Sequence, residues 1–576
     1  MLQLFYDGLG VTNPLRSQGS VHNIGVFYYT IKNLSPVFNS CFGNVHLLAM
    51  GYTRDIAIYG PILEKFVSEI KELSTLGLNG IFPVLGNHTI YASLCQVTCD
   101  NLALNSLFGF IESFSASYFC TICYATKDDI QTKFEEELFE LKRTVDSYKT
   151  DLANLKASRF SNESNTAKSK IHFRGVKTEC PLNKIKGFHV TDNWCLDIMH
   201  TLLEGVVLVE LGCIFHGLCV LDKCLTLSEI NKAMCLFWGK ITVEKNHKPV
   251  QILKIHEPGH VLAPSMKAVQ CWALLKYLPL AVGKTVPPEN KHWKFLLHLS
   301  HLVDLIFAPN FTHEMSVYTE HVISDHLSMF SKLYCSEEVR LRPKHHFLVH
   351  LPTIIMKSGP LVGMSCMRYE LKNSFFKRCA HIVCNFTNIC YTLANRHQQQ
   401  ALETQLSNKH IRNVVTMVKH IIVPTYSLPY LNAIQNSLCF NSCEEVAVSK
   451  TYVASVVYKQ GHFIVVSVDM DTGLPIFGRI FCFISCANYN QSGMCDGKNI
   501  DEWHLVLEIV KTENFTYHLH SYEVIYPSQP VYEILKLKDL LDYHPLHCHS
   551  LLSSSEKRFF IRMPFLMFSY VLHNIL

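Results

Sequence analysis

Strand-like apolar runs recur through the first hundred residues of the chain. Runs rich in aromatic and branched side chains, separated by turn-forming Asn, Pro, Ser and Gly, predict strands at 2–7, 23–34 and 44–52. Residues 61–77 instead have apolar positions at helical spacing, and Gly77 ends that pattern. We therefore expect three strands followed by one helix.

A further run, 89–100, predicts a fourth strand that ends at Asp100, and Asp7 closes the first strand. An aspartate at a strand end is commonly a turn residue or a helix cap. In an RNase H-like fold, however, the first and fourth strands are neighbours, and their two carboxylates meet at the sheet edge. With a third acid from a later helix they bind two Mg²⁺ or Mn²⁺ ions for in-line attack at a phosphate. Asp7 and Asp100 are therefore candidate metal ligands.

The central part of the chain is expected to be helical. Residues 126–158 carry dense charges of both signs at leucine-type spacing, which predicts a solvated helix or helical hairpin, with a coiled-coil dimerisation arm as the alternative. Residues 159–170 are polar and predict a flexible joint. The pattern from 181 to 435 is overwhelmingly helical, with proline-marked breaks.

The longest apolar stretch, 202–221, approaches the length of a membrane span but contains Glu204, Glu210 and His216. Each acid at mid-bilayer would cost about 2.5 to 3.5 kcal/mol on the insertion scale. We therefore expect a buried helix and no membrane partner.

The pattern changes to strands after residue 437. Alternating runs with Lys-Gln-Gly and Asp-Thr-Gly turns predict a small β domain at about 445–545.

The composition of the chain indicates how large a core it can form and in which cellular compartment it is expected. With 576 residues, 48% of them hydrophobic, the chain can fill the cores of two or three domains. The 23 cysteines are scattered, and Met1–Gly10 has neither a basic segment nor an apolar core. This favours reduced thiols in the cytosol or nucleus and argues against secretion. The net charge of +4 permits nucleic acid without arguing for it.

Four blocks occur in one order over residues 6–398, and together they resemble CACTA (En/Spm)-type DNA transposases. They are "YDGLGVTNP" (6–14), "CDNLALNSLFGFIESFSASYFCTIC" (99–123), "CLDIMHTLLEGV" (195–206) and "MRYELKNSFFKRCAHIVCNFTNICYTLANRHQ" (367–398). The resemblance implies an acidic catalytic triad of Asp7, Asp100 and Glu370. From the residues alone, Glu370 would simply pair with a nearby Arg or Lys.

The pair Cys120 and Cys123 has metal-ligand spacing but supplies only two of the four ligands that zinc takes. His345 and His350 are the candidate partners, and their arrangement before Glu370 resembles the zinc site in the catalytic core of the V(D)J recombinase and its Transib transposase relatives. His346 is the rival to His345, because residues at i and i+4 share a helical face. Two buried thiols without metal are the alternative.

Asp197 and His200 lie at i and i+3 on one predicted helical face, and Glu204 follows one turn later. The resemblance implies an auxiliary active-site or DNA-end contact for these three residues. A buried, hydrogen-bonded polar cluster that organises the insertion explains them equally well.

The chain also departs from the family pattern. Relatives read Asn-Pro-Leu-Gly where this chain has "NPLRS", and Glu-Ala-Lys-His where it has "YELKN", so that Asn373 replaces a histidine. Six residues precede Asp7, which leaves no room for a separate N-terminal DNA-binding module. We therefore expect a truncated, decayed or domesticated copy.

The predicted fold class is α/β: an RNase H-like catalytic core interrupted by a large, mostly α-helical insertion and followed by a small C-terminal β domain. The core comprises 1–125 and 341–435; the charged helical arm and joint, the insertion, the β domain and the C-terminal tail occupy 126–176, 177–340, 445–545 and 546–576.

The predicted function is two-metal DNA cleavage and strand transfer by a nuclear transposase-like protein. Its expected partners are transposon ends, target DNA and further copies of itself, with no small-molecule substrate. A non-catalytic DNA- or chromatin-interaction protein on the same fold is the alternative, and an unrelated zinc-stapled helical scaffold is a third.

Overall fold

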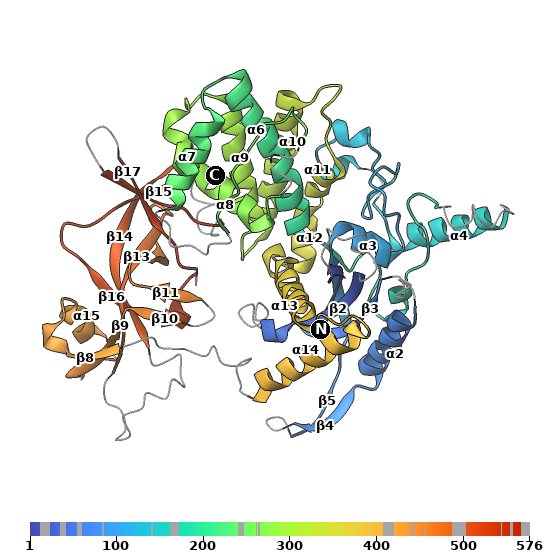
Figure 1. Cartoon of the computed structure of the whole chain (residues 1–576), viewed down its shortest axis with the longest axis horizontal. Coiled ribbons are helices and arrows are strands. Elements are labelled where there is room, and N and C mark those ends of the chain that lie inside the picture. Colours follow the sequence, from blue (N-terminus) through green and yellow to red (C-terminus); the bar gives the residue numbers. More distant parts are fainter. Residues whose placement is uncertain are drawn as a thin grey trace. The chain divides into compact units, whose positions relative to one another are not determined.

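The computed structural model in Figure 1 is a mixed α/β protein. It describes residues 1–11, 23–34, 42–53, 60–82, 86–139, 142–161, 172–239, 247–260, 262, 265–406, 420–437, 439–440, 443–453, 456–486, 503–542, 544–552 and 557–565. The predicted joint from 162 onward, residues 12–14 of the first block and the end of the tail from 566 therefore lie outside the described residues.

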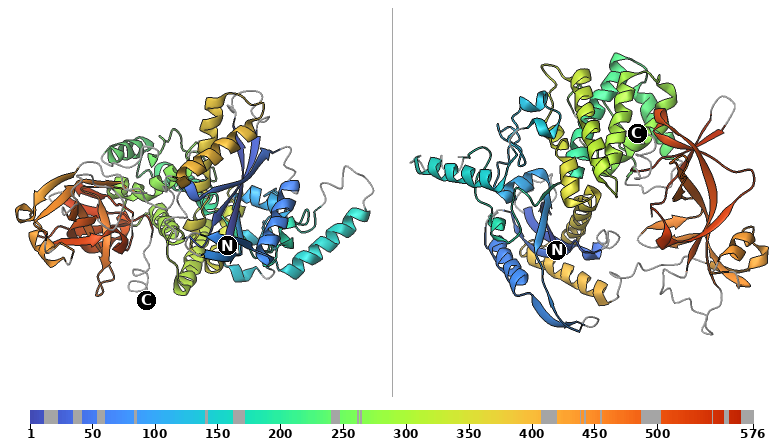
Figure 2. Two further views of the ribbon diagram at one scale, coloured as in Figure 1. Left: turned by 90° about the horizontal axis from the view of Figure 1, so that it is seen from below. Right: turned by 180° about the vertical axis from the view of Figure 1, so that it is seen from behind.

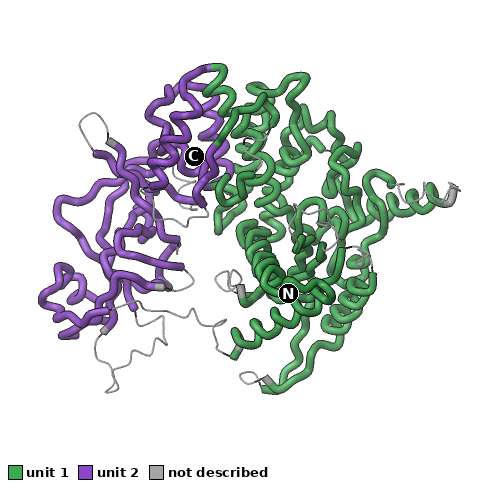
Figure 3. The backbone as a smooth tube through the Cα atoms, viewed as in Figure 1, with its two compact units in different colours: residues 1–221, 252–272, 305–410 green, residues 222–251, 273–304, 411–576 purple. Residues whose placement is uncertain are grey.

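The chain forms two compact units, which are coloured separately in Figure 3. Unit 1 comprises Met1–Leu221, Ile252–Trp272 and Leu305–His410, and unit 2 comprises Asp222–Gln251, Ala273–Asp304 and Ile411–Leu576.

Unit 1 is built around a five-stranded sheet whose first three strands confirm the prediction. Its strands are β1 (Leu2–Gly10), β2 (Asn23–Ile31), β3 (His46–Tyr52), β6 (Leu94–Cys99) and β7 (Trp194–Leu196). They are ordered β3-β2-β1-β6-β7. β2 pairs antiparallel with β1 and β3, whereas β6 runs parallel to both β1 and β7. The first and fourth predicted strands are therefore neighbours in the sheet.

Helices cover both faces of this sheet (Figure 2). They are α2 (Pro61–Thr75), α3 (Asn101–Phe108), α13 (Met367–Val383) and α14 (Ile389–Leu406). The α2 helix confirms the prediction for 61–77. On α13, the ring of Tyr369 stacks on Phe5 of β1 with the ring centroids 4.1 Å apart. Because side chains alternate along a strand, Asp7 lies on the same face as Phe5 and therefore faces α13.

The prediction of a single strand over 89–100 is wrong. Residues 78–90 instead form a hairpin of β4 (Leu78–Phe82) and β5 (Gly86–Ile90), which is a separate two-stranded sheet, and β6 begins only at Leu94. The described β5 side chains are all exposed, whereas β6 is largely buried. The change in burial marks the break that the apolar pattern concealed.

The predicted helix over 126–158 is also only partly correct. The α4 helix covers Val145–Ser161, and the preceding segment contains only the short 3-10 turns η2 (Asp129–Gln131) and η3 (Glu136–Leu138) among its described residues. Glu136 in η3 contacts a distant histidine, as described below, and this tertiary contact overrides the local helical pattern.

The rest of unit 1 is mostly helical. Its remaining helical segments are η1 (Phe42–Asn44), η4 (Pro181–Lys184), η5 (Met199–Val206), α6 (Val207–His216), η6 (Gly217–Leu221), α10 (His313–Tyr334), α11 (Pro343–Leu348), α12 (Leu351–Ser358) and η9 (Leu361–Met364). The helical run Met199–Leu221 is apolar and long enough to cross a membrane, but 78% of its apolar 18-residue window is buried inside the protein. Buried core helices have the same composition.

Unit 2 combines helices with a curled C-terminal sheet. The helical part consists of α7 (Leu227–Trp238), most of α8 (Ala268–Val282), η8 (Gly283–Thr285) and most of α9 (Lys291–Ile306). The main path of the sheet is β17-β18-β15-β14-β13-β9-β8, with β12 on β13 and β16 on β14. These strands are β8 (His420–Pro424), β9 (Glu445–Ser449), β12 (Phe463–Val468), β13 (Pro475–Cys486), β14 (His504–Thr516), β15 (Ser521–Ile525), β16 (Tyr532–Lys536), β17 (Cys548–Leu552) and β18 (Lys557–Ile561).

Smaller elements complete the sheet region of unit 2. They are η10 (Thr425–Ser427), α15 (Leu431–Asn436), the hairpin of β10 (Thr451–Val453) and β11 (Val457–Lys459), η12 (Tyr517–Leu519) and η13 (Leu537–Asp539).

Buried polar contacts join the helices of unit 2 to its sheet. Asp304 at the end of α9 accepts hydrogen bonds from Arg562 and from His520, each at 3.0 Å, and all three side chains are buried. Trp293 donates its indole N–H to the carbonyl of His518 at 3.2 Å. The helices and the sheet therefore share one core.

Cys443 in this region is disulfide-bonded. The cysteines discussed below are free thiols.

Candidate metal centre and acidic site

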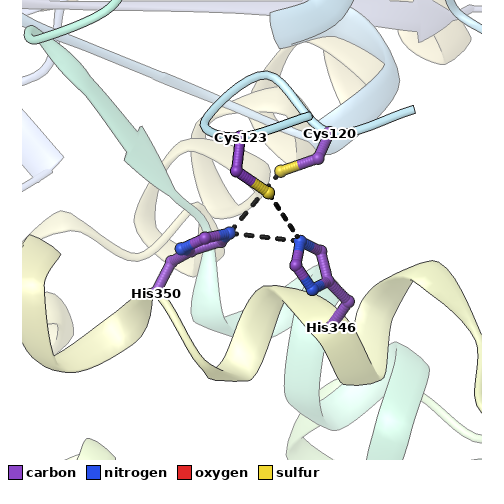
Figure 4. Close-up of side chains that lie close together, drawn as sticks. All are labelled: Cys120, Cys123, His346 and His350. Atoms are coloured by element: carbon purple, nitrogen blue, oxygen red, sulfur yellow. Dashed lines mark hydrogen bonds between the residues drawn. The ribbon is translucent and has the colours of Figure 1, made fainter. Parts of the chain in front are cut away.

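Two cysteines and two histidines converge in the interior of unit 1 (Figure 4). Cys120 and Cys123 lie in the loop that follows α3, His346 is in α11, and His350 caps α12. All four residues are buried, and one ligand atom from each lies within 4.8 Å of all the others. Segments more than 200 residues apart in the chain therefore supply one cluster.

The distances fit a tetrahedral zinc site. The Sγ of Cys123 lies 3.2 Å from Nε2 of His346, the Sγ of Cys120 lies 3.7 Å from Nε2 of His350, and the two Nε2 atoms are 3.2 Å apart. Tetrahedral zinc with ordinary bond lengths separates a sulfur from a nitrogen by about 3.5 Å and two nitrogens by about 3.3 Å. The donor set and its spacing are therefore compatible with a structural zinc.

Neighbouring groups hold these four side chains in place. The backbone N–H groups of Ile122 and Ala125 donate to the sulfurs of Cys120 and Cys123, each at 3.4 Å. Nδ1 of His350 lies 2.8 Å from Oε1 of Glu136. A carboxylate on the far nitrogen of a metal-binding histidine fixes its tautomer and orientation. Glu136 is thus the partner that leaves Nε2 of His350 aimed at the sulfurs.

His345 is not part of this cluster, so the prediction of His345 as the second histidine ligand is wrong. Its Nδ1 accepts the backbone N–H of Arg342, and its Nε2 lies 3.5 Å from Glu210. Glu210 is fully buried and also contacts His326 at 2.9 Å. His346 and His350 stand four residues apart and meet across one turn, whereas His345 points to a different side, toward Glu210.

The register of the sheet brings Asp7 and Asp100 together. Tyr6 pairs with Cys99 across the parallel strands β1 and β6, so the residues that follow them occupy adjacent positions on neighbouring strands. Such strands lie about 4.8 Å apart. β1 continues to Gly10, so Asp7 lies within the strand rather than at its end, and Asp100 is the N-cap of α3, accepting the N–H of Ala103 at 2.5 Å.

Asp7 is largely enclosed, and its pKa is shifted. Its Oδ2 accepts the side-chain amide of Asn373 at 2.7 Å, and the oxygen of that amide accepts the hydroxyl of Tyr28 at 2.6 Å. The pKa of Asp7 is raised to about 6, first by burial and then by the negative charge of Asp100, with a further contribution from Glu370. Converging carboxylates of this kind are typical of cation sites and catalytic sites.

Glu370 reaches the same region from the first turn of α13 and contacts a histidine. Its Oε1 lies 3.4 Å from Nε2 of His200, whose Nδ1 lies 2.7 Å from Oδ2 of Asp197. Burial lowers the pKa of His200, but hydrogen bonds to Asp197 and Glu370 outweigh it and raise the pKa to about 10. His200 is therefore a cation at neutral pH and lies between two carboxylates.

The other predicted secondary residue, Glu204, lies at the edge of this network. Its Oε2 is 3.9 Å from Nε2 of His200, in the π-helical turn Met199–Val206. Asp197 is buried and accepts the backbone N–H groups of His200 and Cys366 at 2.9 and 2.8 Å. Asp197, His200 and Cys366 also offer ligand atoms within 4.8 Å of one another, but these hydrogen bonds already occupy both Asp197 oxygens.

The zinc-type cluster and the acidic site are joined through short segments of unit 1. Asp100 begins α3, and Cys120 lies in the loop beyond that helix. On the other side, His350 begins α12, and Glu370 follows in the next α-helix, α13. A metal held by the cluster would therefore restrain the two segments that carry Asp100 and Glu370.

Two contributing residues lie outside the sequence predictions. Glu136 lies in a charged segment for which the sequence predicts a solvated helix. Asn373 stands out in the sequence only because it replaces a histidine of the family pattern. The position of Asn373, three residues after Glu370 on one helical face, is the signal that could have identified it.

No protein-family model matches this chain, and no curated protein sequence matches it either.

Proposed function

We propose that unit 1 is an RNase H-like catalytic core with a large helical insertion, and that the protein is a transposase-like DNA nuclease and strand transferase of the CACTA type. The observation that carries the proposal is the meeting of Asp7 and Asp100 on adjacent parallel strands, with Glu370 on the helix that packs on the same face. The sheet order β3-β2-β1-β6-β7, antiparallel and then parallel, supports it.

The donor set at this site suits hard divalent cations. Carboxylate oxygens are the ligands that Mg²⁺ and Mn²⁺ prefer, and Asp7, Asp100 and Glu370 would hold them. Such ions supply an activated water or hydroxyl nucleophile and neutralise charge on the phosphate. Burial, and then the negative charges of Asp100 and Glu370, raise the pKa of Asp7, and bound cations would offset the contribution of those charges.

The surrounding residues have positioning roles in this proposal. Asn373 fixes the orientation of the Asp7 carboxylate, and Asp197 orients the ring of His200. The positive His200 in turn holds Glu370 and adds a cation beside the phosphate that the site would bind. The buried Cys120, Cys123, His346 and His350 cluster would hold a structural zinc outside the reaction itself.

The test is metal-dependent nicking of supercoiled plasmid DNA by the full chain and by Glu370→Gln. The substitution keeps the shape of the side chain and removes its charge, so we expect nicking to be abolished while the melting temperature is retained. Glu64→Gln, an exposed position on α2, is the matched control and should nick at the wild-type rate. Equal nicking by Glu370→Gln and Glu64→Gln would refute the catalytic assignment.

The second candidate is a non-catalytic DNA- or chromatin-interaction protein on the same fold. It is favoured by the contacts that the acids already make within the protein. The amide of Asn373 donates a hydrogen bond to Asp7, and His200 pairs with Glu370, so these carboxylates have partners without a metal. This candidate predicts DNA binding that Glu370→Gln leaves unchanged, with no nicking by the wild-type chain at any Mg²⁺ or Mn²⁺ concentration. For either candidate we propose a nuclear protein that acts on DNA as a homo-oligomer.

A further inference from the structure

One flank of α13 continues from Glu370 to the far end of the helix and is exposed throughout. Ser374, Lys377 and His381 follow Glu370 at intervals of four, seven and eleven residues, which keeps them on the same side of an α-helix. Arg378 lies beside Lys377, and all four side chains are exposed. We call Ser374, Lys377, Arg378 and His381 the α13 flank.

The packing of α13 fixes the direction in which this flank points. The neighbouring side of the helix is buried against the sheet: Tyr369 stacks on Phe5, Asn373 bonds Asp7, and the ring of Phe376 lies 6.3 Å from that of Tyr28. The helix cannot rotate about its axis without breaking these contacts. The α13 flank is therefore a fixed surface of unit 1.

The two strong cations of the flank are uncompensated. Lys377 and Arg378 form no ion pair with any residue in the described part of the chain. Many other basic side chains of unit 1 do pair: Arg143 contacts Asp151 at 3.4 Å, and Lys142 contacts Glu136 at 3.1 Å. Adjacent unpaired cations on a rigid helix attract a polyanion.

The length of the flank is compatible with several phosphates of a DNA strand. From Glu370 to His381 the helix rises about 16 Å, at 1.5 Å for each residue. That is about five steps of a DNA strand at 3.4 Å each. The imidazole of His381 is an additional phosphate donor, and one end of the flank is the acidic site itself.

We propose that the α13 flank is the path of the DNA strand that enters the Asp7, Asp100 and Glu370 site. This inference rests on the proposed function for the identity of the polyanion. Lys377 and Arg378 bind consecutive phosphates, and the strand then reaches the carboxylates at Glu370. The flank contacts only phosphates, so it contributes affinity and register without sequence preference.

The experiment is a salt titration of the binding of a fluorescein-labelled DNA duplex of mixed sequence, without added divalent ion. Each lost phosphate contact lowers the slope of log K against log salt by about 0.9, so the Lys377→Ala, Arg378→Ala double variant should lose about 1.8. The matched control is Lys71→Ala, Lys332→Ala, which removes two exposed lysines from α2 and α10. Its slope should equal that of the wild type.

The outcomes separate this inference from the proposed function. An unchanged slope in the Lys377, Arg378 variant, or an equal loss in both double variants, overturns the inference even if wild-type protein nicks plasmid. A slope lowered only in the Lys377, Arg378 variant supports it, and if the wild type then nicks nothing, the nuclease proposal alone fails. Melting temperatures of both variants verify that neither result reflects unfolding.

Discussion

Removal of Glu136 should weaken zinc binding although Glu136 is not a ligand. Its Oε1 lies 2.8 Å from Nδ1 of His350, and its other oxygen accepts the hydroxyl of Thr353. The side chain is only 11% exposed, so water cannot substitute fully for it. Loss of such an outer carboxylate typically costs 10- to 100-fold in metal affinity, or about 1.4 to 2.7 kcal/mol.

The perturbation is Glu136→Ala, and the adjacent Glu137→Ala is the control. Glu137 is exposed, so its removal changes the net charge by the same amount without touching the histidine. Glu136→Gln retains an acceptor oxygen and should fall between the two, with a loss of less than about tenfold. The assay is competition for zinc with a chromogenic chelator, followed to equilibrium at fixed pH.

The result that would refute this reasoning is equal zinc affinity in Glu136→Ala and Glu137→Ala. In that case the contact at His350 would contribute nothing to the centre, and its ligands would be held by packing alone. Zinc bound at less than one equivalent by the wild type itself would refute the centre as a whole.

Three further predictions concern other parts of the molecule. His346→Ala should lose the bound zinc, whereas His345→Ala should keep one equivalent by atomic absorption, and the reverse result would restore the ligand set expected from sequence. Asn373→Ala should raise the Mg²⁺ concentration needed for half-maximal nicking by about tenfold, because it removes the amide that holds Asp7. Tyr28→Phe should raise it less, because Tyr28 contacts that amide and not Asp7 itself. Identical Mg²⁺ dependence in the wild type and Asn373→Ala would contradict this. Burial, with the positive charges of His547 and Lys276, lowers the pKa of His549 to about 3, so the folded state excludes a proton that the unfolded state takes up below about pH 6.5. Stability is therefore lost as pH falls, and His549→Phe, which can still stack on Phe237, should reduce that loss by about 1.4 kcal/mol for each pH unit between 6 and 4 in urea titrations; parallel curves would contradict it.

The strands were the most predictable part of the fold because their signal is local. Residues 2–10, 23–31 and 46–52 are rich in the aromatic and branched side chains that are typical of strands, and Asp7 and Asp100 follow from their order. The hairpin at 78–90 could not be separated from the next strand, because Ile90 at the end of β5 is apolar although it is exposed. The apolar pattern therefore continues from β5 into β6. The register that aligns Tyr6 with Cys99 depends on pairing between distant segments.

The metal centre was predictable in type but not in every ligand. A Cys-x-x-Cys pair indicates a zinc site from spacing alone, and the choice between His345 and His346 depends on which side of one helical turn faces the cysteines. Helical geometry favours His346, whereas resemblance to a more distant site favoured His345. Glu136 could not be found from sequence, because its role arises only where η3 meets α12.

The route of the chain has a consequence for how its parts can be separated. The backbone passes between the two units at 221/222, 251/252, 272/273, 304/305 and 410/411, so neither unit is one continuous segment. A fragment that begins at residue 411 would retain Arg562 and lose Asp304, and a buried charge left without its partner costs about 3 to 5 kcal/mol. Loss of function in a C-terminal deletion would therefore report misfolding of α7, α8 and α9 as much as the removal of a binding module. Point substitutions, or a rearranged gene that joins 222–251, 273–304 and 411–576, are the means to assign separate roles to the two units.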